Sequence, residues 1–181
     1  SSAASDVYKR QSYMVVEGRN QGQYYPDYAY RHPLFSPGMR IYSDSTVSKF
    51  LSSVKDEQIA GFLNDWNTDR DHKSRIYVSY DSTNKNCQAG DVDFVEFGKA
   101  KVDLGLPIFN VGLAMDQNNR IPLFYELYPG SINDVSQFKF MVDKAVGYGY
   151  KNIGFIIDRG YFCKANIRYM DEKNYGFVMM V

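Results

Sequence analysis

Two aspartates in this sequence follow runs of strand-forming residues and could form a reactive pair. Asp81 closes the alternating stretch "IYVSYD", and Asp158 closes the apolar run "IGFIID". A charged residue directly after such a run usually marks the point where the chain leaves a sheet. Two carboxylates held a few ångströms apart repel each other unless a proton or a cation lies between them. If the fold brings the two strands together, the pair therefore predicts a site for Mg²⁺ or Mn²⁺, which prefer oxygen ligands and support phosphoryl transfer.

The elements that must position this pair can be ordered along the chain. A strand at 76–81 is expected from its alternation of apolar and polar residues. After it come a hairpin with strands 107–116 and 121–128, a helix from "PGSIND", a strand at 153–158, a helix at 164–173 and a strand from 175. This order predicts a mixed sheet with helical cover, in which a right-handed crossover sets the strand of Asp158 parallel to that of Asp81. The two aspartates would then be neighbours at one edge of the sheet.

Helical periodicity marks further elements. Two short amphipathic helices precede the sheet, with apolar residues at i, i+3, i+4 and i+7. Their stripes are Val47, Phe50, Leu51 and Val54, then Ile59, Phe62, Leu63 and Trp66. Asp44 or Ser45 is expected to cap the first helix and Asp56 the second. The stripe of the helix after the hairpin is Phe138, Met141, Val142 and Ala145. Asp134 and Gln137 are placed as its capping box.

Two segments show no sustained period. The stretch from Ser12 to Met39 is rich in Tyr, Pro, Gly and Arg and predicts an extended, irregular lead-in. Residues 82–106 are polar and contain glycine, and the pattern assigns them to no element.

Composition and charge set few limits on function. The chain has 181 residues, of which 44% are hydrophobic, and its 21 basic residues equal its 21 acidic ones. A formal charge of zero argues neither for nor against a polyanionic partner, because clustering of Lys and Arg matters as well as their sum. No apolar run approaches the length of a membrane span and no secretory signal is present, which predicts a cytoplasmic protein. Cys87 and Cys163 lack metal-ligand spacing and are expected to be reduced thiols.

Both ends of the chain suggest a piece of a longer protein. The first eleven residues, "SSAASDVYKRQ", resemble the translation of a tagmentation sequencing adapter, and the last ones, "YGFVMMV", read as an unfinished strand. We therefore expect residues 1–11 to be an artefact of library preparation. Residues 12–74 would be the lead-in with two short helices, and residues 75–181 a truncated catalytic core.

Three stretches together resemble a known family. "YVSYDST", "GLAMDQNNRIPLFYELYPGSIND" and "IGFIIDRGYF" are similar, in order and spacing, to the catalytic region of bacterial insertion-sequence transposases of the DDE type. The resemblance covers roughly residues 40 to 181 and is strongest to the cut-and-paste group, which carries a β-rich insertion before its last catalytic residue. It implies an α/β, ribonuclease-H-like fold: three antiparallel strands, then parallel strands with helices, after an N-terminal helical segment.

The resemblance also implies an activity. Asp81 matches the first catalytic carboxylate of the family and Asp158 the second, and both would bind Mg²⁺ or Mn²⁺ while a water, and later a DNA 3′-hydroxyl, attacks a phosphodiester. The partners implied are double-stranded DNA, as transposon ends and target, and a second copy of the protein assembled on that DNA. The third carboxylate, a Glu in a helix with a Tyr, Arg, Glu and Lys signature, is absent from this sequence. We therefore expect these 181 residues to be inactive by themselves.

Other charged residues near the pair have two interpretations each. Arg159 could contact a phosphate or act as the structural counter-ion of the acidic pair. Lys85 and Lys164 are candidate DNA-backbone contacts, although solvated surface charge explains them as well. Asp134 could lie near the metals, but helix capping explains it more simply.

Two other functions are compatible with the sequence. One is a Mg²⁺-dependent phosphatase or phosphotransferase in which Asp81 acts as nucleophile. The absence of a second Asp two residues later, where Thr83 stands, weighs against its common version. The other is a transposon-derived DNA-binding protein that keeps the fold without the chemistry.

Overall fold

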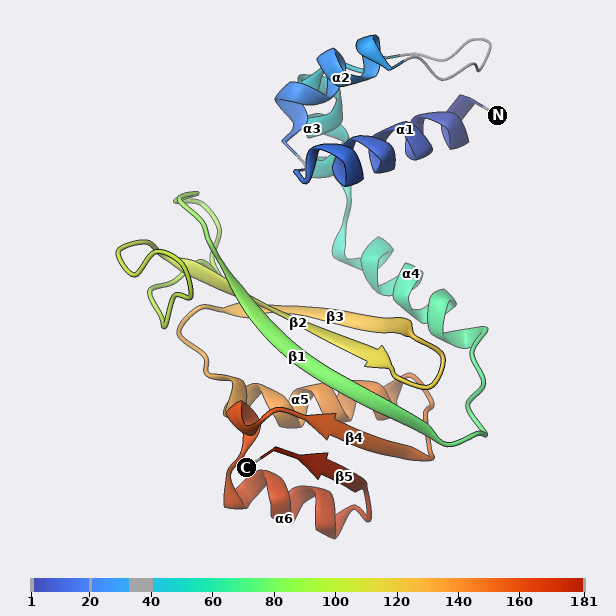
Figure 1. The fold of residues 1–181 in the computed structure, drawn as a ribbon, viewed down its shortest axis with the longest axis vertical. Coiled ribbons are helices and arrows are strands. Elements are labelled where there is room, and N and C mark those ends of the chain that lie inside the picture. The colour runs from blue at the N-terminus through green and yellow to red at the C-terminus, as the bar shows by residue number, and fades with distance from the viewer. Residues whose placement is uncertain (1, 20, 33–40, 181) are drawn as a thin grey trace. The chain divides into compact units, whose positions relative to one another are not determined.

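The computed structural model describes residues 2–19, 21–32 and 41–180 of the chain (Figure 1). The chain divides into two compact units, Ser1–Ala60 and Gly61–Val181. Within the described ranges, no helix combines the length and the apolar character that crossing a membrane requires.

The described part of the first unit is helical where an irregular lead-in was expected, and residues 33–39 of that lead-in lie outside the described residues. Its elements are α1 (Ser2–Glu17), the 3-10 turn η1 (Gly22–Tyr24), α2 (Tyr25–Arg31) and α3 (Asp44–Ser53). Tyr13 of α1 and Tyr25, Tyr28 and Ala29 of α2 form a small buried core, against which Val47 of α3 packs. Tyr25, Tyr28 and Ala29 stand at i, i+3 and i+4, but α2 has only seven residues, so the helical period is too short to stand out in the sequence. Tyr13, Tyr25 and Tyr28 thus form the core of this unit, whereas Tyr24 and Tyr30 are exposed.

The two amphipathic helices are confirmed, but the cap of the first helix and the burial of both stripes differ from expectation. They are α3 and α4 (Asp56–Thr68), which begins in the first unit and ends in the second. Ser43, one residue before the expected caps, is the N-cap of α3, and its hydroxyl accepts from the Thr46 N–H at 3.2 Å. Four of the eight stripe residues are exposed, among them Phe50 at 66% and Phe62 at 62%, and only Leu63 is buried. Helical period was therefore a sound guide to structure here and a poor guide to burial.

The second unit is built on a five-stranded mixed sheet. Its strands are β1 (Ile76–Asn86), β2 (Ile108–Asp116), β3 (Ile121–Pro129), β4 (Ile153–Ile157) and β5 (Gly176–Met179), in the order β3-β2-β1-β4-β5. β1, β2 and β3 pair antiparallel, whereas β4 runs parallel to β1 and β5 parallel to β4. This is the ribonuclease-H-like arrangement that the resemblance implied: three antiparallel strands followed by parallel ones. The predicted fold class is confirmed.

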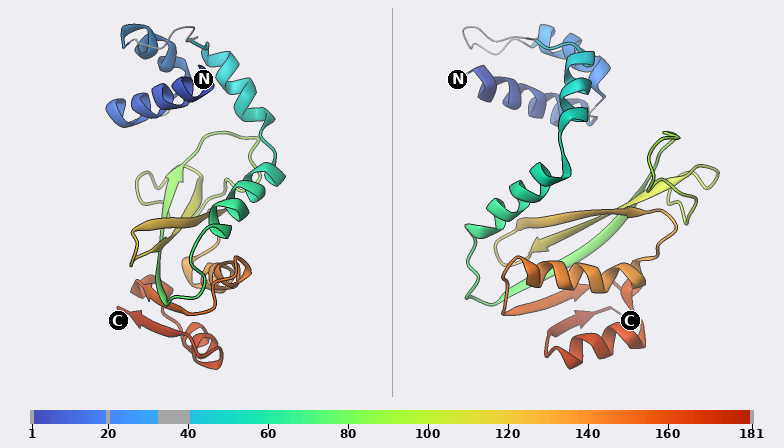
Figure 2. Two further views of the ribbon diagram at one scale, coloured as in Figure 1. Left: turned by 90° about the vertical axis from the view of Figure 1, so that its right-hand side faces the viewer. Right: turned by 180° about the vertical axis from the view of Figure 1, so that it is seen from behind.

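One face of this sheet is covered by α5 (Asp134–Gly147), as Figure 2 shows. The four residues of its predicted stripe are all fully buried: Phe138, Met141, Val142 and Ala145. The Phe138 ring meets the Phe155 ring of β4 edge to face, with centroids 6.2 Å apart. After β4 come the 3-10 turn η2 (Arg159–Tyr161) and α6 (Lys164–Glu172), which leads into β5. The inward side chains of β1 and β4 therefore face α5, and their outward side chains lie on the opposite face.

The turn before β1 carries a pH-sensitive carboxylate. Hydrogen bonds from the Ser74 hydroxyl, and then from the backbone N–H groups of Lys73 and Ser74, lower the pKa of Asp71 from 3.8 to about 2. The folded state thus favours the ionised form, so this stabilisation is complete above about pH 4 and is lost as the pH falls toward 2. We expect an NMR titration of the Asp71 carboxyl carbon to give a midpoint near 2. In Asp71→Asn, stability should fall less over this pH range, and a wild-type midpoint near 4 would contradict the assignment.

Candidate active site

Asp81 and Asp158 stand at the same level of the sheet, where the parallel pairing of β1 with β4 ends. The last residues that β1 and β4 pair with each other are Tyr80 and Ile157, and each aspartate is the next residue along the chain. Tyr80 and Ile157 are buried under α5, whereas both aspartates are exposed. Since side chains alternate along a strand, the two carboxylates belong to the sheet face that α5 leaves uncovered. The parallel pairing thus brings together two acids from distant parts of the chain.

Asp81 does not close its strand, which corrects the sequence interpretation. β1 continues for five residues, with pairs from Ser82 opposite Gly112 to Asn86 opposite Ile108 on β2. What ends at Tyr80 is the pairing with β4, so Asp81 marks the end of the parallel ladder and not the end of the strand. The inward positions of this second half are polar but buried, which removes the apolar–polar alternation that marks a strand.

Each carboxylate is oriented by the residue that follows it. Asp81 Oδ1 accepts a hydrogen bond from the Ser82 N–H at 2.8 Å, and Asp158 Oδ1 accepts from the Arg159 N–H at 2.7 Å. The second oxygen of each group accepts no hydrogen bond from the residues that the structure describes. Two exposed carboxylates with one open oxygen each fit the ligand preference of Mg²⁺ and Mn²⁺. Across the described ranges, no three His, Cys, Asp or Glu residues gather into a metal-binding group.

Asp134 has a different role from both roles considered for it. Its Oδ1 accepts from the Ser82 hydroxyl at 2.7 Å and from the Tyr128 hydroxyl at 2.8 Å, which ties β1 and β3 to the first turn of α5. Ser82 points to the α5 face, opposite to its neighbour Asp81, so Asp134 does not join the exposed pair. The helix cap is Asn133, whose side chain accepts from the Ser136 N–H.

The Tyr128 hydroxyl, which donates to Asp134, stays protonated. Burial raises the pKa of Tyr128, and the hydrogen bond to Asp134 acts in the same direction. The second member of the expected capping box, Gln137, also binds elsewhere and donates to the buried carboxylate of Glu126 at 3.0 Å. Asp134 and Gln137 therefore do not form the expected capping box. Their side chains bind residues of the sheet instead, close to β1, the strand that carries Asp81.

Three basic residues were predicted as DNA contacts near the pair, and all three are exposed. Arg159 directly follows Asp158 and is exposed, and the described part of the chain gives it no ion pair with either aspartate. Lys85 is exposed on β1, at an alternate position with the same orientation as Asp81. Lys164 is exposed at the first position of α6. The counter-ion interpretation of Arg159 therefore has no support from these contacts.

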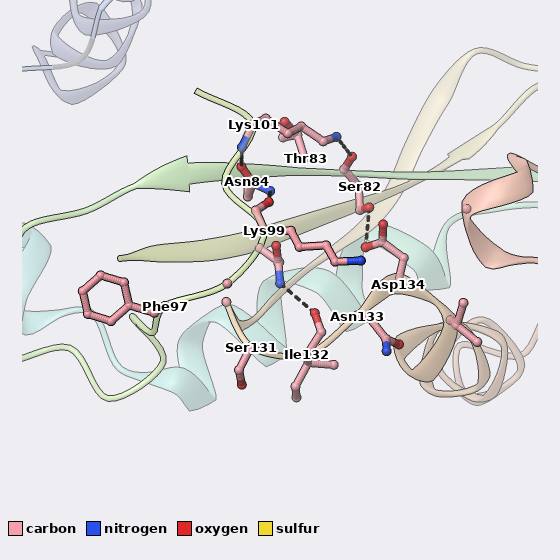
Figure 3. A pocket seen from close by; sticks show the side chains of 15 residues that line it. Ser82, Thr83, Asn84, Phe97, Lys99, Lys101, Ser131, Ile132, Asn133 and Asp134 are labelled. Carbon is pink, nitrogen blue, oxygen red and sulfur yellow. Dashed lines mark hydrogen bonds between the residues drawn. The ribbon is translucent and has the colours of Figure 1, made fainter. Parts of the chain in front are cut away.

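A pocket of about 600 Å³ lies on the α5 side of β1 (Figure 3). It is lined by Ser82, Thr83, Asn84, Phe97, Gly98, Lys99, Lys101, Asn110, Gly130, Ser131, Ile132, Asn133, Asp134, Val135 and Gly160. Two lysines of the β1–β2 connection, Lys99 and Lys101, belong to this lining, and sequence reasoning did not find them. They lie in the segment that showed no period, and only non-local contacts bring them to β1.

Comparisons with known proteins add a family. The family model described as "Transposase DDE domain" matches residues 71–181. A search of curated proteins gave no match. Among solved structures, the Mos1 transposase paired-end complex with the left transposon end is 14% identical, with a TM-score of 0.37. The match covers 94% of this chain and 57% of that one.

Two further solved structures show comparable similarity. A pre-cleavage Mos1 transpososome is 13% identical with a TM-score of 0.38, covering 92% of this chain and 56% of the other. An endonuclease V of Ciona intestinalis, in complex with a 23mer DNA that contains an inosine, is 12% identical with a TM-score of 0.35. That match covers 70% of this chain and 58% of the endonuclease. The chain thus spans less than two thirds of each of these proteins.

Proposed function

Because this chain belongs to the transposase DDE domain family, we propose that it forms part of a catalytic core for metal-dependent cutting and joining of DNA at transposon ends. The observation that carries the proposal is the parallel register of β1 and β4, which ends at Tyr80 and Ile157 and sets Asp81 beside Asp158. Their exposure leaves room for a phosphodiester on the uncovered face of the sheet.

In this proposal Asp81 and Asp158 are the metal ligands. Mg²⁺ or Mn²⁺ bound there supplies positive charge that lowers the pKa of a water or DNA 3′-hydroxyl and stabilises the attacked phosphodiester. The Ser82 N–H donates to one oxygen of Asp81, and the Arg159 N–H donates to one oxygen of Asp158. These hydrogen bonds fix the orientation of each carboxylate and leave its second oxygen for the metal. Arg159, free of ion pairs with these acids in the described chain, contacts a DNA phosphate.

The remaining features of the proposal concern partners and completeness. Double-stranded DNA, as transposon ends and target, is the substrate. Lys85 and Lys164 contact its backbone, and two copies of the protein assemble on it in the cytoplasm.

The described residues bring together two carboxylates and no third. We therefore expect the 181-residue chain alone to show no Mg²⁺-dependent nicking of duplex DNA. Nicking that Asp81→Ala abolishes would overturn this part of the proposal.

Metal binding tests the central claim. We expect the chain to bind Mn²⁺, and Asp81→Asn and Asp158→Asn each to lower the affinity by about tenfold or more, because a charged ligand is lost while the backbone hydrogen bond is kept. Electron paramagnetic resonance of free Mn²⁺ measures this directly. Asp171→Asn, which changes an exposed carboxylate of α6, serves as the control and should bind like the wild type. Equal affinities in all four proteins would exclude the paired site.

A further inference from the structure

The pocket beside β1 has a cationic end formed by Lys99 and Lys101. We call this pocket the lysine cavity. Lys99 extends across it toward Asp134 (Figure 3), and no hydrogen bond or ion pair to the described residues occupies its ammonium group. Lys101 Nζ donates to the Ser82 carbonyl at 2.8 Å, in the part of β1 that has no β4 partner. An ammonium group has three N–H donors, so Lys101 keeps two for a ligand.

The charge balance of the lysine cavity favours an anion. Among the lining residues two lysines face one carboxylate, that of Asp134, which already accepts two hydroxyl hydrogen bonds, and Glu96, outside the lining, accepts from the Ser131 hydroxyl. The first turn of α5 adds partial positive charge from its backbone N–H groups. Phosphate oxygens are the natural acceptors for such a set.

The other end of the lysine cavity is aromatic. Phe97 belongs to the lining and is 69% exposed, and Figure 3 places its ring at the opposite end from the Asp134 carboxylate. A cavity with an exposed aromatic ring at one end and cationic groups at the other can bind single-stranded nucleic acid, because a base stacks on the ring while a phosphate of the same strand meets the cations. A volume of about 600 Å³ is ample for one nucleotide.

The position of these groups is fixed by the backbone. Asn84 donates to the Lys99 carbonyl and accepts from the Lys101 N–H, both at 2.9 Å, which straps the β1–β2 connection to β1. A Cβ on Gly98 would lie 2.0 Å from the carbonyl oxygen of Gly130, so only glycine allows the connection to approach the turn before α5 this closely. The cavity is therefore formed in the absence of any ligand.

The lysine cavity is next to the carboxylate pair in the sequence, although it lies on the α5 side of β1 and the carboxylates lie on the other face of the sheet. Ser82 and Thr83 of its lining directly follow Asp81, and Gly160 lies two positions after Asp158. We propose that the cavity binds a short single-stranded segment of the DNA substrate, with a phosphate on Lys99 and Lys101 at one end and a base on Phe97 at the other. This assignment rests on the proposed function for the identity of the nucleic acid.

Single-strand binding without metal tests this subsite. The probe is a fluorescent oligothymidine of about ten nucleotides, measured by anisotropy in EDTA. Phe97→Ala should weaken binding about tenfold, the effect of losing one base-stacking contact. Lys99→Ala should weaken binding and reduce the slope of log affinity against log salt by about 0.7, the value for one phosphate contact on a single strand. A duplex of the same length should bind more weakly and respond less to Phe97→Ala.

Matched substitutions separate the cavity from general surface effects. Phe140 on α5 is 68% exposed, like Phe97, but lies outside the lining, and Lys151 is exposed at the opposite end of β4. Phe140→Ala and Lys151→Ala should bind within twofold of the wild type. The subsite is excluded if Phe97→Ala binds like the wild type, or if the control variants lose as much affinity. Because EDTA removes metal, failure of the carboxylate pair to bind Mn²⁺ would leave this outcome unaffected.

Discussion

Replacing Asp134 with alanine should destabilise the second unit by about 3 kcal/mol, because two buried hydroxyl groups lose their acceptor. Ser82 is 6% exposed and Tyr128 is 3% exposed, and both donate to Asp134 Oδ1. A buried polar group left without a partner costs about 1–3 kcal/mol, so two such groups account for the estimate. Urea denaturation of the 181-residue chain measures the change in the free energy of unfolding.

Two further substitutions show whether the acceptor or the charge of Asp134 matters. Asp134→Asn keeps the acceptor oxygen and should recover most of the loss, whereas Asp65→Ala, an exposed site on α4, should stay within about 0.5 kcal/mol of the wild type. Because Ser82 adjoins Asp81, Asp134→Ala should also weaken Mn²⁺ binding, although Asp134 is not a ligand. An Asp134→Ala variant as stable as the wild type would show that water satisfies both hydroxyl groups.

The sheet order was predictable from the sequence because its signals are local. A hairpin with a short connection makes antiparallel neighbours, and the helix at "PGSIND" forces a parallel return beside the first strand. That was enough to place Asp81 next to Asp158. The paired residues Tyr80 and Ile157 in the structure give the same adjacency.

The parts that the sequence did not reveal depend on non-local contacts. The second half of β1 is strand because it pairs with β2, while its inward residues are the polar Ser82 and Asn84. Lys99 and Lys101 reach the site because Asn84 holds their backbone, a contact that no periodicity records. The helix caps were displaced by one residue, since Asn and Ser compete with a neighbouring Asp for the same position.

Gly112 is the second position where a single change should have a large effect. A Cβ at this residue of β2 would lie 2.0 Å from the hydroxyl oxygen of Tyr80 and 2.5 Å from its Cζ. The Tyr80 side chain cannot easily move away, because it is 1% exposed, packs edge to face on Tyr161 and donates to Glu126 at 3.1 Å. Gly112→Ala should therefore destabilise the second unit by about 3 kcal/mol, the upper range for overpacking a buried site.

The consequence reaches the candidate active site because Tyr80 is the residue before Asp81 and the last one paired with β4. Displacing its ring shifts the end of the parallel ladder, so Gly112→Ala should lower Mn²⁺ affinity even under conditions where the chain remains folded. Gly61→Ala in α4 is the matched control: its added methyl group meets no atom within 4 Å, and alanine favours a helix by up to about 1 kcal/mol. If Gly112→Ala unfolded at the same urea concentration as the wild type, Tyr80 would have to be mobile and the carboxylate pair would not depend on its packing.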